Sequence, residues 1–295
     1  MFEKDLYIGY EDFLIERPFD FSLHSSIGCG GCAKIAFYPR SEDELIALLS
    51  RLESEGRRYL VVGNLTNVLP SDLGTDKAVV CTKKLNAIKR ISESLVYAES
   101  GILSGALLDF LRREGLEGAE FLSGIPCTLG GALYMNAGVS GAYMQTLVEN
   151  VRIYSGGRVQ TLTNGDCAYA YKDSVFMQGG RVIIGATLRL KESSPDKVFI
   201  RQREYIQKRV RLPKGKSMGC VFKNTQSAPA GELIDKAGLK GMRVGGAIVS
   251  KEHANFIIND KKATAREIKS LITLVKNAVY AQYGVCLEEE IRYLE

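Results

Sequence analysis

Hydrophobic residues recur at intervals of three and four positions in three segments of the chain, which is the spacing of one buried helix face. We therefore expect helices at residues 41–56, 104–114 and 264–283. Each segment ends at or just before a glycine, a residue that commonly ends helices. The predicted inward faces are Leu45, Leu48, Leu49 and Leu52 in the first, Leu107, Leu108 and Leu111 in the second, and Ile268, Leu271, Ile272, Val275 and Val279 in the third.

Polar residues mark the starts of two of these helices. Ser41 with Glu44, and Thr264 with Glu267, have the three-residue spacing of a capping box, in which the two side chains bond each other's backbone N–H groups. The first and third helices are therefore predicted to begin at these residues.

Short apolar runs predict strands between and after the helices, at residues 59–62, 79–81, 151–154, 182–190, 246–249 and 255–258. Strands and helices do not alternate strictly, which favours an α+β fold. The polar segment at 193–197, followed by a charged helix at 198–211, indicates a domain boundary. We expect a first domain at 1–197, in two lobes of about 1–75 and 76–197, and a C-terminal domain at 198–295.

Composition narrows the function classes. The net charge of +5 is spread along the chain without a Lys/Arg run, so we expect no nucleic-acid partner, although a modest positive field suits anionic substrates. No stretch reaches the roughly 20 apolar residues of a membrane helix, and the N-terminus lacks the apolar core of a signal peptide. We therefore expect a cytoplasmic protein without a membrane partner.

The cysteine content gives one alternative to weigh. Seven scattered cysteines in a chain of 295 residues argue against a disulfide framework. Cys29-Gly-Gly-Cys32, with His24 ahead of it, has the spacing of half a metal or redox site, but the sequence offers no second pair of cysteines to complete one. The favoured interpretation is two small residues beside a glycine turn, with no metal.

Two glycine-bearing segments are candidates for binding a ligand. Gly63-Asn64-Leu65-Thr66-Asn67 follows a predicted strand, and such a turn can present backbone N–H groups to a phosphate, although it can equally be a plain loop. Residues 124–138 read GIPCTLGGALYMNAG, and so many glycines in an apolar stretch suggest that a ligand approaches the backbone closely. Neither segment is a phosphate-binding P-loop or a GxGxxG motif.

Two further segments become informative only together. Residues 217–224 read SMGCVFKN, and residues 287–292 read LEEEIR. Taken alone, Cys220 is most simply a small buried residue and the glutamates a solvated surface.

In combination, these motifs resemble the UDP-N-acetylenolpyruvoylglucosamine reductase family. Residues 230–259 (AGELIDKAGLKGMRVGGAIVSKEHANFIIN) look like its C-terminal signature, and residues 124–138 resemble its GIPGTVGGAVYMNAG segment. Residues 25–33 resemble its early TSFRIGG turn, residues 171–176 its YRxSxF motif, and residues 217–224 its GSxFKN motif. The similarity runs from about residue 16 to the C-terminus in the family's order, and the short span from Phe176 to Cys220 fits the type without a tyrosine loop.

The resemblance implies an enzyme of peptidoglycan precursor synthesis. It implies a two-lobed FAD-binding domain of the vanillyl-alcohol-oxidase type, an α+β substrate-binding domain, non-covalent FAD, NADPH as co-substrate and a monomer. The substrate is a UDP-sugar carrying an enolpyruvyl ether. Carried over residue by residue, the cofactor site is Gly63, Asn64, Leu65, Thr66, Asn67, Gly124, Ile125, Pro126, Cys127, Gly130, Gly131, Met135, Gly138 and Arg292, and the substrate site is Tyr171, Lys223, Asn224 and His253.

The implied catalytic residues are Lys172, Cys220 and Glu290. Lys172 stands where the family has the arginine that orients the substrate, and it would place a cation beside the substrate carboxylate. Cys220 stands where the family has its proton-donating serine, and we expect the Lys172 cation to lower the pKa of its thiol. Glu290 would be a neutral acid on that carboxylate or a partner that steers Lys172.

Departures from the family pattern leave two alternatives open. The family usually has glycine at the positions of Leu65 and Cys127, so each adds a side chain near the expected flavin. One alternative is a relative that binds FAD or a nucleotide sugar without catalysis. The other is a flavin oxidoreductase with an altered substrate.

Overall fold

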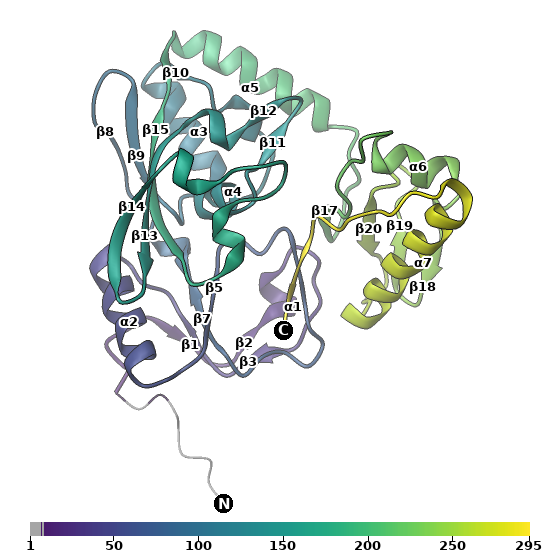
Figure 1. Ribbon diagram of the computed structural model, residues 1–295, viewed down its shortest axis with the longest axis horizontal. Coiled ribbons are helices and arrows are strands. Elements are labelled where there is room, and N and C mark those ends of the chain that lie inside the picture. Colours follow the sequence, from purple (N-terminus) through teal and green to yellow (C-terminus); the bar gives the residue numbers. More distant parts are fainter. Residues whose placement is uncertain (1–6, 8) are drawn as a thin grey trace, which may run out of the picture.

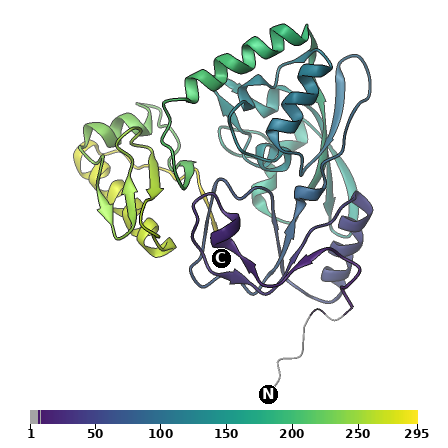
Figure 2. The same ribbon diagram turned by 180° about the vertical axis from the view of Figure 1, so that it is seen from behind.

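The computed structural model describes residue 7 and residues 9–295, and it has three parts (Figure 1). An N-terminal lobe and a second lobe lie one above the other, and a C-terminal unit stands to one side of both (Figures 1 and 2). Each part is built on its own sheet, so the predicted α+β class is confirmed.

The N-terminal lobe has a four-stranded sheet in the order β1 (Ile15–Glu16), β4 (Ala36–Phe37), β7 (Ala78–Cys81) and β5 (Tyr59–Val62). Strand β7 is parallel to both of its neighbours, and β1 pairs with β4 antiparallel. Helix α2 (Glu42–Ser54) contributes four buried leucines to the same core. The smaller elements are the hairpin β2 (Phe19–Asp20) and β3 (Cys32–Ala33), helix α1 (Phe21–His24) and the 3-10 turn η1 (Thr82–Lys84).

The second lobe has a five-stranded antiparallel sheet in the order β14 (Arg158–Thr163), β13 (Val148–Ser155), β15 (Val182–Arg189), β9 (Leu95–Glu99) and β8 (Ile88–Arg90). Its helices are α3 (Ser104–Arg113), α4 (Leu129–Tyr134) and α5 (Pro195–Arg209). The remaining elements are β10 (Leu116–Glu117), β11 (Gly138–Val139), β12 (Ala142–Tyr143), β16 (Lys191–Glu192), η2 (Glu120–Leu122), η3 (Met144–Thr146), η4 (Gly165–Cys167) and η5 (Val175–Gln178).

The C-terminal unit has an antiparallel sheet in the order β17 (Ser217–Cys220), β20 (Phe256–Asn259), β19 (Ala247–Val249) and β18 (Arg243–Val244). Helices α6 (Ala230–Lys236) and α7 (Ala265–Tyr283) complete it, and their apolar faces are buried in a common core.

The end of the chain ties this unit to the N-terminal lobe. Strand β21 (Arg292–Leu294) leaves the C-terminal unit and pairs in parallel with β6 (Val68–Pro70). Figure 1 shows the yellow end of the chain crossing to the N-terminal lobe. The carboxylate of Asp72 accepts hydrogen bonds from the backbone N–H groups of Ala265 and Arg266, at 2.7 and 2.9 Å, and so caps α7. These contacts hold the end of the chain and the start of α7 against residues 68–72, which follow the turn at residues 63–67.

The strong sequence patterns are confirmed element by element. All three amphipathic helices form and bury the predicted faces, and β5 has the predicted bounds. The capping box of Thr264 and Glu267 is present. That of Ser41 and Glu44 is only half present, because the Glu44 side chain bonds the backbone N–H and the guanidinium of Arg40.

The predicted charged helix begins earlier than expected. Ser194 caps it and Pro195 is its first residue, so the segment at 193–197 provides a helix start. Helix α5 contacts α3 and η2 in the second lobe. The division into domains remains a prediction, and we propose to place it after α5, because the helix packs with the residues before it.

The structure shows the surroundings of the two cysteines near the N-terminus and the character of the helices. Cys29 is buried in the core of the C-terminal unit, whereas Cys32 is exposed in β3. Among the described residues, no group of three or more histidine, cysteine or acidic side chains is arranged to hold a metal ion. In the same part of the chain, no helix is long and apolar enough to cross a membrane.

Candidate active site

The turn at residues 63–67 presents unpaired backbone donors. In the described part of the chain, the N–H groups of residues 64–67 donate no hydrogen bond. Leu65 has a φ of 51°, and a left-handed residue in such a turn points successive N–H groups to one side. The Asn64 side chain donates to the carbonyl oxygen of Pro126 at 2.8 Å, so the two predicted cofactor segments are in contact.

The Leu65 side chain points away from these donors. It is 6% exposed and packs in a core cluster of the N-terminal lobe with residues such as Phe21 and Val62. The Leu65 side chain is therefore part of the protein core of this lobe.

Leu65→Gly is expected to lower the free energy of unfolding by about 1 to 3 kcal/mol. Losing a buried leucine costs roughly 2 to 5 kcal/mol, and relief of the left-handed backbone returns roughly 1 to 2 kcal/mol. Leu65→Ala should be less stable than Leu65→Gly, because alanine loses the same packing and keeps the strain. Urea unfolding measures both, and a Leu65→Gly protein more stable than the wild type would contradict this account.

The segment at 124–138 contains the short helix α4, and the chain itself explains most of its glycines. A Cβ on Gly130 would approach the Cβ of Ser100 to 3.0 Å, and one on Gly138 would meet the Tyr143 ring at 2.2 Å. Gly124 has a φ of 76°. Most of these glycines therefore have a structural reason within the chain, whether or not a ligand also approaches them. Among the predicted four, only Gly131 would accept a Cβ at ordinary contact distance, 3.4 Å from Thr128 Oγ1.

Lys172 lies at the tip of a tight turn. The backbones of Ala170 and Asp173 exchange two hydrogen bonds, of 3.1 and 3.2 Å, which leaves Tyr171 and Lys172 as the central residues. Lys172 has a φ of 54°, a strained value for a residue with a side chain. Asn136 anchors the turn by donating to the Ala170 carbonyl at 2.8 Å, so the turn is fixed to the end of the 124–138 segment.

The three glutamates of the terminal motif have different surroundings. Glu288 is exposed and Glu289 bonds Lys276 and Tyr293 within the C-terminal unit. Glu290 points the other way and pairs with Lys172, with 2.8 Å between Oε1 and Nζ. The Lys172 side chain is 15% exposed and the Glu290 side chain 14%.

Cys220 is placed beside this ion pair by two backbone pairings. It ends β17 and lies opposite Phe256, and the next residue, Val221, accepts a hydrogen bond from the Glu290 backbone at 2.8 Å. The buried Asn255 side chain clamps the following residue through both Phe222 backbone groups, each at 2.8 Å. The structure therefore brings together Lys172, Cys220 and Glu290, which are far apart in the sequence.

The electrostatics of the thiol reverse one expectation. Burial, helped by the Glu290 carboxylate, raises the pKa of Cys220 to about 11, although the Lys172 and Arg209 cations act to lower it. The predicted net lowering is therefore wrong, because desolvation of the thiolate outweighs the attraction of the cations. A thiol with this pKa stays protonated throughout the neutral range, which is the state that a proton donor needs.

Alkylation of Cys220 by iodoacetamide is expected to be slow at pH 7 to 8 and to accelerate as the pH approaches 11, because the thiolate is the reactive form. Turnover should correspondingly show no loss near pH 8.5. Mass spectrometry of the modified peptide, with the exposed Cys32 as an internal reference, measures the rates. A Cys220 rate that levels off below pH 9 would contradict the shielded thiol.

The predicted substrate residues surround this cluster on one side. The Tyr171 hydroxyl accepts a hydrogen bond from the Asn224 backbone at 3.3 Å, which joins the Lys172 turn to the C-terminal unit. Lys223 lies 3.5 Å from the Glu288 carboxylate. Burial lowers the pKa of His253, whose Nδ1 accepts from the Asn255 backbone at 3.3 Å, so the neutral ring offers Nε2–H as a donor near the start of α6.

The remaining predicted cofactor residues lie in the C-terminal segment and in the second lobe. The backbone of Arg292 donates to the Asn67 carbonyl at 3.0 Å, and the Asn67 side chain donates to the Glu290 carbonyl at 3.1 Å. Ile125 packs at the edge of the second-lobe core, as does Cys127, where burial raises the thiol pKa to about 11. Met135 ends helix α4.

Arg209 is a site residue that the sequence analysis missed. It ends α5, and its Nε–H donates to the carbonyl oxygen of Gly124 at 3.1 Å. Its charge also acts on the thiols of Cys127 and Cys220. Nothing in the sequence pattern separates it from the other cations of a charged helix.

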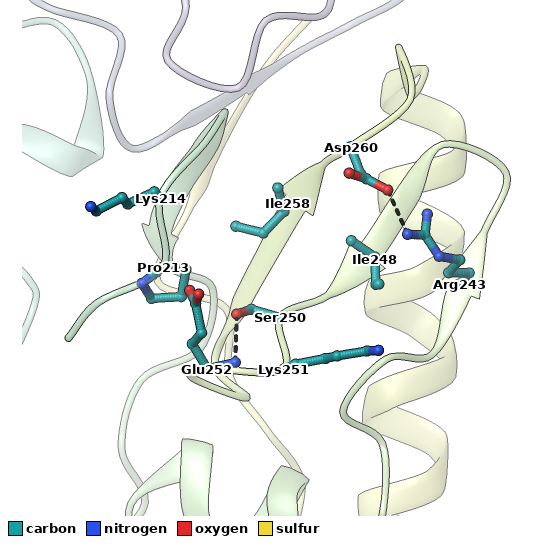
Figure 3. Close-up of a pocket in the computed structure, with 9 residues that line it drawn as sticks. All are labelled: Pro213, Lys214, Arg243, Ile248, Ser250, Lys251, Glu252, Ile258 and Asp260. Atoms are coloured by element: carbon teal, nitrogen blue, oxygen red, sulfur yellow. Dashed lines mark hydrogen bonds and ion pairs between the residues drawn. The ribbon is translucent and has the colours of Figure 1, made fainter.

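A shallow hollow of about 180 Å³ lies apart from this site, on the sheet of the C-terminal unit (Figure 3). Ile248 and Ile258 form its floor, and Lys214, Arg243, Lys251, Glu252 and Asp260 are among its charged rim. Arg243 is paired with Asp260 there. None of the predicted site residues lines it.

The turn at residues 63–67 and the segment at 124–138 fit FAD by two observations. The unpaired N–H groups of residues 64–67 can bind a diphosphate. Among the described side chains, the buried hydroxyls of Ser100 and Ser123 have no hydrogen-bond partner, and Ser100 contacts Gly130 while Ser123 precedes Gly124. The residues present can therefore hold the dinucleotide between the two lobes.

Comparison with known proteins defines first the class and then the family. The model of an FAD-binding domain matches residues 33–162, which include both candidate cofactor segments. Together with the ion pair and thiol beside it, this match defines an FAD-dependent oxidoreductase. The model of the UDP-N-acetylenolpyruvoylglucosamine reductase C-terminal domain matches residues 210–294.

Whole-chain relatives complete the assignment. The UDP-N-acetylenolpyruvoylglucosamine reductase of Clostridioides difficile is 35% identical over 100% of this chain and 99% of its own length. That of Geobacter metallireducens is 39% identical over 94% of this chain and 93% of its own. The crystal structure of the Thermus caldophilus enzyme superposes with a TM-score of 0.83 at 30% identity, over 96% of this chain and 100% of that one. The chain belongs to the UDP-N-acetylenolpyruvoylglucosamine reductase family.

Proposed function

We propose that the protein reduces UDP-N-acetylglucosamine enolpyruvate to UDP-N-acetylmuramate, with NADPH as the hydride source, in peptidoglycan precursor synthesis. The observation that carries the proposal is the Lys172–Glu290 pair at 2.8 Å with the protonated thiol of Cys220 beside it. A cytoplasmic location and a monomeric state are part of the same proposal.

FAD, when bound, would supply the chemistry for moving a hydride from NADPH to the terminal vinyl carbon of the substrate. The backbone N–H groups of residues 64–67 and the segment at 124–138 would hold it, with Arg292 at the edge. The roles of these residues are inferred from their places in the structure and from the motifs they share with the family.

The residues of the chain handle the charge and the proton. As the hydride adds to one vinyl carbon, negative charge builds on the neighbouring carbon and spreads into the carboxylate, so preorganised cations and donors lower the barrier. Lys172 supplies a cation, and Glu290 holds Lys172 in place. Cys220 then gives its proton to the α-carbon, which completes the lactyl ether. Tyr171, Lys223, Asn224 and His253 would contact the UDP-sugar.

The proposal is tested with purified protein, FAD, NADPH and the enolpyruvyl UDP-sugar. Flavin fluorescence should be quenched on binding, and NADPH absorbance should fall only when the substrate is present. Quenching without NADPH consumption would favour the non-catalytic alternative. Consumption with a product other than UDP-N-acetylmuramate would favour an altered substrate, and protein that binds no flavin would contradict the enzyme altogether.

A further inference from the structure

The cation inherited from the family motif is already neutralised in this protein. Lys172 Nζ lies 2.8 Å from Glu290, and both side chains are largely buried. Glu290 offsets part of the Lys172 charge, so the pair attracts an anionic group less strongly than an unpaired cation would. An ammonium group also lacks the planar fork with which a guanidinium grips a carboxylate.

Arg209 lies on another side of the same site. Its side chain passes over Gly124, where an added Cβ would come within 3.0 Å of Arg209 Cδ. The Nε–H bond to Gly124 fixes the end of the side chain, and the guanidinium acts on Cys127 in the second lobe and on Cys220 in the C-terminal unit. The cation therefore stands at the junction of the candidate flavin segment and the candidate proton donor.

The charge of Arg209 is not balanced by an acid. Over residue 7 and residues 9–295, no ion pair within 4.0 Å involves Arg209, whereas Arg201 on the same helix pairs with Glu117 at 2.7 Å. Burial lowers the pKa of Arg209, with only the two thiols opposing it. A partly buried cation without a partner is unfavourable unless an anion arrives from outside the chain.

We propose that Arg209 binds the carboxylate of the enolpyruvyl group and provides the guanidinium fork that Lys172 lacks. This inference rests on the proposed function. The atom protonated by Cys220 is bonded directly to that carboxylate. The charge of Arg209 acts on Cys220 while its side chain is held at Gly124, so the cation lies on the side of the site where that carboxylate is expected. The two NH2 groups of the guanidinium remain for a bidentate contact when Nε–H bonds Gly124.

The test uses the FAD-loaded enzyme and two ligands that share a diphosphate but differ in the carboxylate. These are UDP-N-acetylglucosamine enolpyruvate and UDP-N-acetylglucosamine, titrated by the change in flavin absorbance. Arg209→Gln should weaken binding of the enolpyruvyl ligand about 10- to 100-fold, the loss of a charged hydrogen-bond pair, and leave the second ligand unchanged. Arg209→Lys should recover part of the loss. Arg203→Gln, on the same helix beside Phe199, is the matched control and should match the wild type.

Each other outcome overturns the inference. Unchanged affinity for the enolpyruvyl ligand would show that Arg209 does not touch it. An equal loss for both ligands would assign Arg209 to the diphosphate. Weakened FAD binding or slowed reduction by NADPH would show that Arg209 serves only to brace Gly124. Failure of the proposed function looks different, because the wild-type enzyme itself would then not turn over the enolpyruvyl ligand.

Discussion

In the Cys220→Ala protein, NADPH is expected to reduce the bound flavin at the wild-type rate, and the reaction is then expected to stall when substrate is added. A positioned general acid contributes roughly 10²- to 10⁴-fold, so reoxidation by substrate should slow by about that factor. The thiol is half-buried and, with a pKa of about 11, keeps its proton through the neutral range, so it is in the donating state when the substrate arrives. Stopped-flow absorbance of the flavin separates the two half-reactions.

Two further variants make this result specific. Cys220→Ser should restore much of the substrate half-reaction, because a hydroxyl is the donor that the family motif uses. Cys286→Ala removes an exposed thiol that lies just before the terminal motif, and it should behave as the wild type. If Cys220→Ala reoxidises its flavin at the wild-type rate, the donor is water or Glu290.

Glu290→Gln is expected to slow the substrate half-reaction about 10²- to 10³-fold and to leave reduction by NADPH nearly unchanged. Losing one preorganised group that supports developing charge has an effect of that size. The neutral amide could not form the ion pair that holds the Lys172 side chain in place. Lys172 lies in a strained turn, with a φ of 54°, so its side chain would then lose its partner. The same stopped-flow measurement gives both rates.

The neighbouring glutamate supplies the control for that variant. Glu288→Gln removes the same charge two positions earlier, from an exposed side chain that lies 3.5 Å from Lys223. It should have a small effect on either half-reaction. Equal slowing of both half-reactions in Glu290→Gln would show that Glu290 supports the flavin or the fold.

The helices were predictable because their signals are local. Leu45, Leu48 and Leu52 recur with the helix period, and Thr264 with Glu267 marks a start that does not depend on distant contacts. Helix α4 was not predicted, because the glycines of the 124–138 segment interrupt its hydrophobic pattern. These glycines are required by tertiary neighbours such as Ser100 and Tyr143, which the sequence does not reveal.

Only those site residues that lie in family motifs could be predicted from the sequence. Lys172, Cys220 and Glu290 were found through the family resemblance, and the structure places them side by side. Arg209 was not found, because its role depends on the fold: the end of α5 meets Gly124, which is 85 residues away in the sequence, only when the second lobe has folded. The pKa of Cys220 was predicted with the wrong sign, because burial is a property of the packed site and cannot be read from the neighbouring charges alone.

The most direct test of the proposed reaction is anaerobic mixing of the NADPH-reduced protein, freed of nicotinamide, with UDP-N-acetylglucosamine enolpyruvate. The account predicts that the flavin absorbance returns within the first turnover, with one equivalent of UDP-N-acetylmuramate formed for each flavin reoxidised. Flavin that stays reduced in the presence of saturating substrate would contradict it.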